Sequence, residues 1–130
     1  MIEEAEDVKS LAISAFSKLS SKQQISPDFN KLALLDLRGV IITSPGKDYD
    51  FVSRAFFPKY GIFEDPVTGS AHTMLTPYWS KKLNKSELKA KQISERGGKL
   101  FCRNEGNRVF ISGYAKLYMV GEIHLTEANS

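Results

Sequence analysis

The sequence has 130 residues but only one cysteine, Cys102, which excludes a disulfide framework and a cysteine-based metal cluster. Its two histidines, His72 and His124, are too few for the three or four ligands that zinc needs. No apolar run approaches the roughly 20 residues of a membrane helix, and the acidic N-terminus is unlike a signal peptide. We therefore expect a cytoplasmic protein with no resident metal or membrane segment, in which Cys102 is a buried, inert thiol.

Charge is not lacking, but basic charge is concentrated in one segment. Residues 81–103 contain eight lysines and arginines against two glutamates, whereas the net charge of the whole chain is only +3. Such a run attracts nucleic acid or an anionic substrate, or simply forms a solvated face. Because no nucleic-acid-binding motif accompanies it, we favour the solvated face and expect no nucleic-acid partner.

The first 58 residues predict two helices and then two strands. Apolar residues at three- and four-residue spacings predict an amphipathic helix over residues 3–22. Ser26 is a candidate N-cap for a second, short helix that ends by Gly39, with Pro27 at its first position. β-Branched and alternating residues that each end at a proline predict strands over residues 38–45 and 49–58.

The remainder predicts one central helix followed by strands. An apolar stripe predicts a helix that begins at Gly69 or Ser70 and bends near Pro77. From Leu88 onward the period changes to two, which predicts four strands in an antiparallel meander, over residues 88–95, 98–104, 107–113 and 114–125. The fold class is therefore predicted to be α+β, a mostly antiparallel sheet wrapped around a central helix.

Functional chemistry is suggested by the stretch "GIFEDPVTGSAHTMLTPYW", residues 61–79. Glu64 and Asp65 are adjacent, so in an extended chain they point in opposite directions and at most one faces a site. Pro66 keeps Asp65 extended, and the backbone N–H groups of Thr68, Gly69, Ser70 and Ala71 then open a helix whose positive end favours an anion. Asp65 is thus a candidate proton carrier beside a small anionic substrate.

Simpler interpretations of the same residues stay open. Asp65 or Thr68 can merely cap the helix, and His72 is favoured as a hydrogen-bonded structural residue rather than a base. Arg96, before two glycines, either clamps a substrate carboxylate or belongs to a tight turn, and we favour the turn. Arg54 is expected to pair with Asp65 or Glu64 and so to orient the loop.

The segments "DFVSRAFFPKYGIFEDPVTGSAHTMLTPYW", "QISERGGKLF" and "GNRVFISGYAKLYMVGEIHL" closely resemble the PhzF-like isomerases of phenazine biosynthesis. The resemblance runs from residue 27 to about residue 125. It implies a fold similar to diaminopimelate epimerase, with two pseudo-symmetric lobes and a site in the cleft between them. Residues 27–130 resemble the C-terminal lobe alone, and residues 1–26 are expected to form a helical lead-in.

The resemblance also implies a cofactor-independent proton shift on a small carboxylic acid. Asp65 matches the acidic residue of this lobe, while Gly69 and Ser70 match positions that contact substrate. The family's principal glutamate and a Gly-His pair belong to the N-terminal lobe, which is not found in this sequence. Three interpretations remain: one lobe of a two-lobe isomerase that is inactive alone, a binding module that kept only the fold, or a homodimer that rebuilds the cleft.

Overall fold

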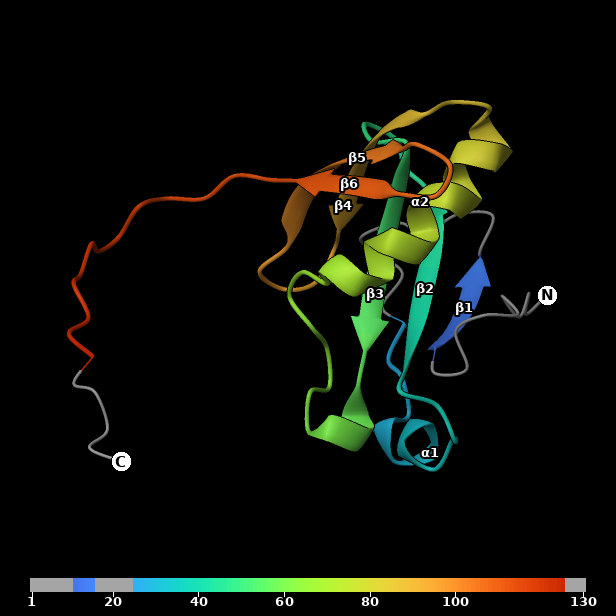
Figure 1. Ribbon diagram of the computed structural model, residues 1–130. Coiled ribbons are helices and arrows are strands. Elements are labelled where there is room, and N and C mark those ends of the chain that lie inside the picture. The colour runs from blue at the N-terminus through green and yellow to red at the C-terminus, as the bar shows by residue number, and fades with distance from the viewer. Residues whose placement is uncertain (1–10, 16–24, 126–130) are drawn as a thin grey trace.

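The computed structural model describes residues 11–15 and 25–125, which form one mixed sheet and one long helix (Figure 1). The elements are β1 (Leu11–Ala15), α1 (Phe29–Ala33), β2 (Gly39–Pro45), β3 (Phe51–Phe56), the 3₁₀ turn η1 (Pro58–Tyr60), α2 (Gly69–Leu83), β4 (Glu87–Gln92), β5 (Gly98–Asn104) and β6 (Val109–Ser112). The strands lie side by side in chain order. The pairs β1–β2 and β3–β4 are parallel, and the other three pairs are antiparallel. The predicted α+β class is confirmed.

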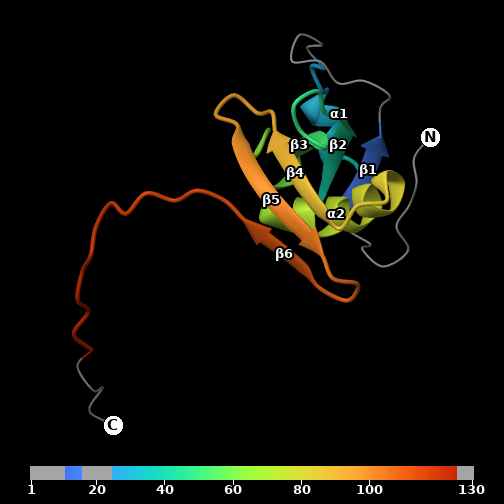
Figure 2. The same cartoon turned by 90° about the horizontal axis from the view of Figure 1, so that it is seen from above.

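The long helix α2 lies against one face of the sheet, as both views show (Figures 1 and 2). Ala71, Leu75 and Trp79 are four residues apart, so they share one face of the helix, and all three are fully buried. They contact buried side chains of β2 to β5, among them Ile41, Phe51, Leu88, Ala90, Leu100 and Cys102. α2 begins at Gly69, as predicted, and ends where Asn84 adopts the left-handed conformation. The helix continues through Pro77, and the bend expected there stays a prediction.

The opposite face of the sheet carries a smaller core under α1. Ile42, Val52 and Phe56 are buried there, with Phe29 of α1 packed against them. The cap of α1 is Asp28, whose side chain accepts a hydrogen bond from the backbone N–H of Lys31. The predicted cap, Ser26, is therefore wrong, because the carboxylate two residues later reaches the free N–H groups of the first turn.

The first predicted helix is also wrong where the structure describes it. Leu11–Ala15 form β1, which pairs in parallel with β2 from Leu11 opposite Gly39 onward. Pairing with the exposed edge of β2 outweighs the helical spacing of these residues, because local propensity is a weak preference that tertiary contacts override. The other residues of 3–22 lie outside the described part, and a domain boundary after residue 26 stays a prediction.

Of the four strands predicted after α2, three are confirmed as β4, β5 and β6. Residues 114–125, which we call the C-terminal arm, form no strand and run away from the rest of the fold (Figures 1 and 2). The alternating pattern of the arm suits a strand, but a strand also needs a neighbour to receive its hydrogen bonds. No strand among the described residues lies beside it.

Candidate functional site

The loop of residues 61–68, which carries the motif, is fixed to the end of β3. A short antiparallel bridge joins Phe57 to Ile62, and the backbone N–H of Asp65 donates to the carbonyl of Ala55 over 2.9 Å. Gly61 makes the turn with a φ of 75°, a conformation that a residue with a Cβ rarely adopts. The loop therefore reaches the start of α2 in a defined position.

Gln92, at the end of β4, holds the other side of this loop. It is fully buried, and its Oε1 accepts from the backbone N–H of Thr68 over 2.8 Å. Its Nε2 donates to the carbonyl of Asp65 at 2.7 Å and to the hydroxyl oxygen of Thr68 at 3.0 Å. Ser94 adds a hydrogen bond from its hydroxyl to the carbonyl of Pro66. These partners were missed from the sequence, although Gln92 shares the helix-facing side of β4 with apolar Leu88, which marks it as a buried polar group.

Glu64 and Asp65 diverge, as their adjacency predicted. Arg54 pairs with Glu64, not with Asp65, through two parallel hydrogen bonds of 2.7 and 2.8 Å. The third interaction of Arg54 is a donated hydrogen bond to the carbonyl of Ile25. The hydrogen bonds to Glu64 raise the pKa of Arg54, which keeps the guanidinium charged. The Arg54–Glu64 pair fixes one side of the loop, and Asp65 lies on the other side.

The side chain of Asp65 accepts a hydrogen bond from the hydroxyl of Thr68. Thr68 occupies the N-cap position of α2, yet its side chain makes no capping bond to the helix. The interpretation of Thr68 or Asp65 as a mere cap is therefore not supported for α2. Neither side chain covers the backbone N–H groups of the first turn, which carry the positive end of the helix.

These residues line one open hollow of about 470 Å³. It is lined by Asp65, Val67, Thr68, Gly69 and Ser70, together with Arg38, Phe57, Tyr60 and Ile62. A Cβ on Gly69 would meet nothing within 4 Å, so the approach to the helix start is open. Ala71 is fully buried and does not line the hollow, so a binding role for this residue stays a prediction. Arg38, on the segment before β2, was not predicted from the sequence and adds a cation to this wall.

His72 lies beneath the helix start as a structural residue, as favoured from the sequence. It is fully buried against the ring of Phe51, and its Nδ1 lies 2.8 Å from the carbonyl of Thr68. Since a carbonyl only accepts, Nδ1 carries the proton. Burial lowers the pKa of His72, and the hydrogen bond to Thr68 opposes this without cancelling it. The imidazole is therefore neutral.

We expect this neutral histidine to make folding stability depend on pH. The unfolded chain takes up a proton on His72 below about pH 6.5 and the folded chain does not, so the free energy of unfolding falls as the pH drops from 7 to 5. One proton gives at most about 1.4 kcal/mol per pH unit. Urea unfolding at several pH values should show a shallower slope for His72→Gln. The exposed His124→Gln serves as the control, and equal slopes in all three proteins would contradict the assignment.

Arg96 does not reach the hollow of Asp65. It lines a separate hollow of about 360 Å³ with Glu64, Pro66, Ser94 and Glu95. Gly97 follows with a φ of 68°, and a side chain on Gly98 would collide with Val67. Gly97 is thus required by the turn, and Gly98 is required because Val67 packs directly against its backbone. Both observations support the interpretation of Arg96 as part of a tight turn.

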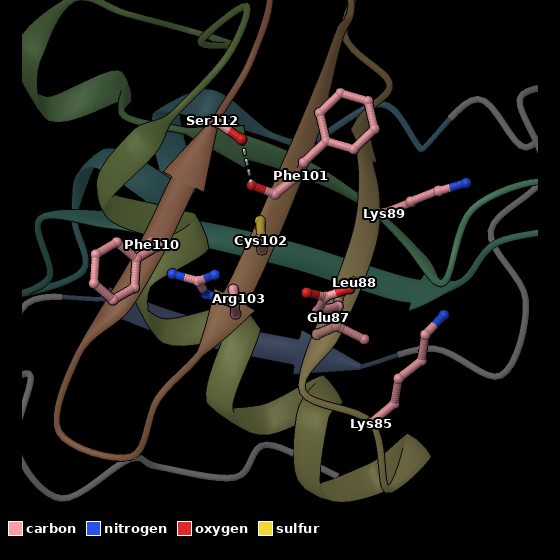
Figure 3. A pocket seen from close by; sticks show the side chains of 9 residues that line it. All are labelled: Lys85, Glu87, Leu88, Lys89, Phe101, Cys102, Arg103, Phe110 and Ser112. Atoms are coloured by element: carbon pink, nitrogen blue, oxygen red, sulfur yellow. Dashed lines mark hydrogen bonds between the residues drawn. The ribbon is translucent and has the colours of Figure 1, made fainter.

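A further hollow of about 470 Å³ lies on the face of β4, β5 and β6 that points away from α2 (Figure 3). Its cations are partly neutralised by acids from outside the basic run. Lys85 pairs with Asp50 at 2.7 Å, and Arg103 pairs with Glu105 at 2.9 Å. Burial opposes ionisation of Asp50, but hydrogen bonds from Lys85 and from the backbone of Lys89 outweigh it and lower its pKa. These ion pairs favour the interpretation of residues 81–103 as a solvated face rather than as an anion-binding surface. Cys102 borders this hollow, but it is buried in the core on the side of α2, and burial raises its pKa.

Comparison with known proteins identifies the motif. The profile described as "Phenazine biosynthesis-like protein" (PhzC-PhzF) matches residues 6–121. The chain belongs to the PhzC-PhzF family. An uncharacterized isomerase of Pseudomonas aeruginosa is 57% identical over 100 residues, which cover 77% of this chain and 38% of the relative. A phenazine biosynthesis-like domain-containing protein of Bos taurus is 47% identical over 95 residues, 67% of this chain and 33% of the relative.

Solved structures of the PhzC-PhzF family share the fold. A PhzC/PhzF protein from Clostridium difficile superposes with a TM-score of 0.77 at 43% identity, over 88% of this chain and 45% of the other. A PhzF-family protein from Enterococcus faecalis gives a TM-score of 0.73 at 50% identity, over 88% and 44%. The chain thus spans less than half the length of the PhzC-PhzF relatives it matches.

Within residues 11–15 and 25–125, no helix is both long and apolar enough to cross a bilayer. In the same residues no three His, Cys, Asp or Glu side chains converge in a way that would hold a metal ion. The expectations of a cytoplasmic location and of chemistry without a cofactor stay predictions.

Proposed function

We propose that this chain is the C-terminal lobe of a PhzF-like isomerase that moves a proton on a small carboxylic acid without a cofactor. One observation carries the proposal. Asp65 and the uncapped start of α2 line the same open hollow, and Gln92 fixes the loop that joins them. This arrangement supports an anion site with a proton carrier beside it.

In this proposal the substrate carboxylate binds the N–H groups of Gly69 and Ser70, where the helix dipole stabilises negative charge. Arg38 lines the same hollow and adds positive charge. Asp65 then gives or takes the proton at a neighbouring carbon, with the hydroxyl of Thr68 holding its carboxyl group in place. The open hollow supports binding by this lobe alone.

A proton shift between two positions needs a second group on the other side of the substrate. That group is proposed to come from a companion lobe, since the relatives are more than twice as long as the matched segment. We therefore expect no turnover of a dihydro-hydroxyanthranilate or of diaminopimelate by this chain alone, measured by chromatography of the products. Turnover that disappears in Asp65→Asn would contradict this expectation and would favour a site rebuilt by two copies.

We expect inorganic phosphate to bind weakly at the start of α2. Titration followed by amide NMR should shift Gly69, Ser70 and Ala71 first. Asp65→Asn should tighten binding several-fold, because the ionised carboxylate repels the anion. Gly69→Val should abolish it, because a branched side chain fills the open approach.

Thr73→Val is the matched control, since Thr73 is exposed one turn further along the same helix. It should bind phosphate like the unaltered chain. If phosphate instead shifted only residues 81–103, the site at the helix start would be refuted and the basic face would be the anion site.

A further inference from the structure

Two buried polar atoms near the start of α2 have no hydrogen-bond partner in the described part of the chain. Within residues 11–15 and 25–125, the buried polar side chains are Thr43, Ser44, Ser53, Thr68, His72, Thr76 and Gln92. Five of these seven make hydrogen bonds that engage their polar atoms. Among the seven, Ser53 and His72 alone keep an unpaired atom, Oγ in the first and Nε2 in the second. Buried polar atoms are nearly always hydrogen-bonded, so this coincidence needs an explanation.

Ser53 lies on the side of β3 that faces α2. It alternates with Phe51 and Ala55, which both belong to the main core, so it shares their face. Its neighbours across the sheet are Thr43 on β2 and Gln92 on β4. Since Gln92 binds the helix start, the hydroxyl of Ser53 lies in the layer between the centre of the sheet and the first turns of α2.

His72 enters the same layer from the helix. Its ring packs on Phe51 with centroids 5.8 Å apart and planes 29° from parallel, so Phe51 covers one flat side of the imidazole. The ring edge, which carries Nε2, is left to polar neighbours. One turn earlier on α2, Thr68 contacts Gln92, the cross-strand neighbour of Ser53. Ser53 and His72 are thus both bounded by Phe51 and by the contact between Thr68 and Gln92.

The two unpaired atoms are chemically complementary. Nδ1 of His72 carries the ring proton because it donates to a carbonyl, so Nε2 can only accept. The hydroxyl of Ser53 can both donate and accept. We propose that one buried water molecule joins them, donating a proton to Nε2 of His72 and accepting the hydroxyl proton of Ser53. Buried waters typically bond to polar groups that the protein itself leaves unpaired.

This water extends a chain of hydrogen bonds that ends at the proposed proton carrier. Nδ1 of His72 holds the carbonyl of Thr68 at 2.8 Å, and Gln92 holds the N–H of Thr68, also at 2.8 Å. The hydroxyl of Thr68 in turn donates to the carboxylate of Asp65. Ser53 and His72 are therefore positioning residues for Asp65. That role rests on the proposed function, whereas the water site does not.

Water-to-protein nuclear Overhauser spectroscopy of the unaltered chain tests the water site. The ring protons Hδ2 and Hε1, which flank Nε2 of His72, should show cross-peaks with the sign of a long-lived bound water. Ser53→Ala should keep them, because Nε2 still needs a donor and the space is larger. Ser53→Val should remove them, because its methyl groups fill that space. Ser112→Val makes the same change on the exposed face of β6 and should have no effect.

Two outcomes would refute the water. One is the absence of the cross-peaks in the unaltered chain. The other is their loss in Ser53→Ala, which would show that the hydroxyl proton itself was the source. A long-range proton–nitrogen spectrum adds an independent measurement. In Ser53→Val, Nδ1 of His72 should stay protonated while the Nε2 resonance moves to higher frequency, as for a ring nitrogen that loses a hydrogen bond, and an unmoved resonance would contradict the proposal.

A double-mutant cycle tests the positioning role through phosphate binding. In the unaltered chain Asp65→Asn should tighten binding several-fold. In Ser53→Val the same change should tighten it less than about twofold, because the carboxylate is no longer held beside the helix start. His72→Phe interrupts the chain of hydrogen bonds one step later and should give the same result, which covers the case in which Ser53→Val does not fold.

The cycle separates failure of this role from failure of the proposed function. If Asp65→Asn tightens phosphate equally in all backgrounds, Ser53 and His72 do not position Asp65. If phosphate shifts neither Gly69 nor Ser70 in the unaltered chain, the anion site fails, and the water cross-peaks still decide whether Ser53 and His72 share a buried water.

Discussion

Replacing Trp79 with alanine should lower the free energy of unfolding by about 4 kcal/mol, measured by urea denaturation. Trp79 is fully buried in α2, and its ring stacks on Phe51 with centroids 5.7 Å apart and planes only 5° from parallel. Its indole N–H donates to the hydroxyl oxygen of Thr43 over 2.9 Å. The truncation removes the largest side chain between α2 and the sheet, and the surrounding strands cannot collapse into the space.

Trp79→Phe separates packing from hydrogen bonding. It keeps most of the ring and loses the N–H, so it should cost about 1 to 2 kcal/mol. Thr43 still donates its own hydroxyl proton to the carbonyl of Val52, which leaves that hydroxyl with a partner. A loss of less than 2 kcal/mol in Trp79→Ala would contradict the central position of this side chain.

Gln92→Ala should affect both stability and binding. The change removes three hydrogen bonds and leaves the N–H of Thr68 and the carbonyl of Asp65 without their partner in a buried place. Each buried polar group left unpaired costs about 1 to 3 kcal/mol, so a total loss of about 3 kcal/mol is expected. The loop that positions Asp65 should then move relative to the start of α2, and phosphate should no longer shift the amides of Gly69 to Ala71.

Lys89→Ala is the matched control for Gln92→Ala, because Lys89 lies on the same strand with its side chain on the exposed face. It should change stability by no more than about 0.5 kcal/mol and leave phosphate binding intact. Retention of the amide shifts in folded Gln92→Ala would show that the loop does not depend on this glutamine.

Much of this fold was predictable because its elements are marked by local signals. Pro45 ends β2 and Pro58 follows the end of β3. The change from a period near four to a period of two separates α2 from β4. The helix start at Gly69 follows a proline that keeps the preceding chain extended. Such signals lie within a few residues of the element they define.

The predictions from sequence that were wrong concern segments whose structure depends on residues far away in the chain. The residues of β1, "LAISA", suit either a helix or a strand, and pairing with β2, far along the chain, decides between them. The C-terminal arm shows the reverse case. Its pattern predicts a strand, but a pattern cannot supply the neighbour that a strand needs.

The residues of the candidate site likewise divide into those that local spacing predicts and those that depend on a distant partner. Asp65, Thr68, Gly69 and Ser70 are nearly contiguous, so their common hollow was readable from spacing. Gln92 reaches Thr68 across 24 positions, a contact that appears only once β4 lies beside β3.

The strand order has a consequence for how the chain folds. Because each described strand lies next to its predecessor in sequence, the sheet can grow in one direction, each strand adding to an edge made a moment earlier. A chain emerging from the ribosome can complete the hairpin of β2 and β3 before α2 has been synthesised. The slowest step should be the parallel crossover from β3 to β4, since α2 must fold and dock within it before β4 can join.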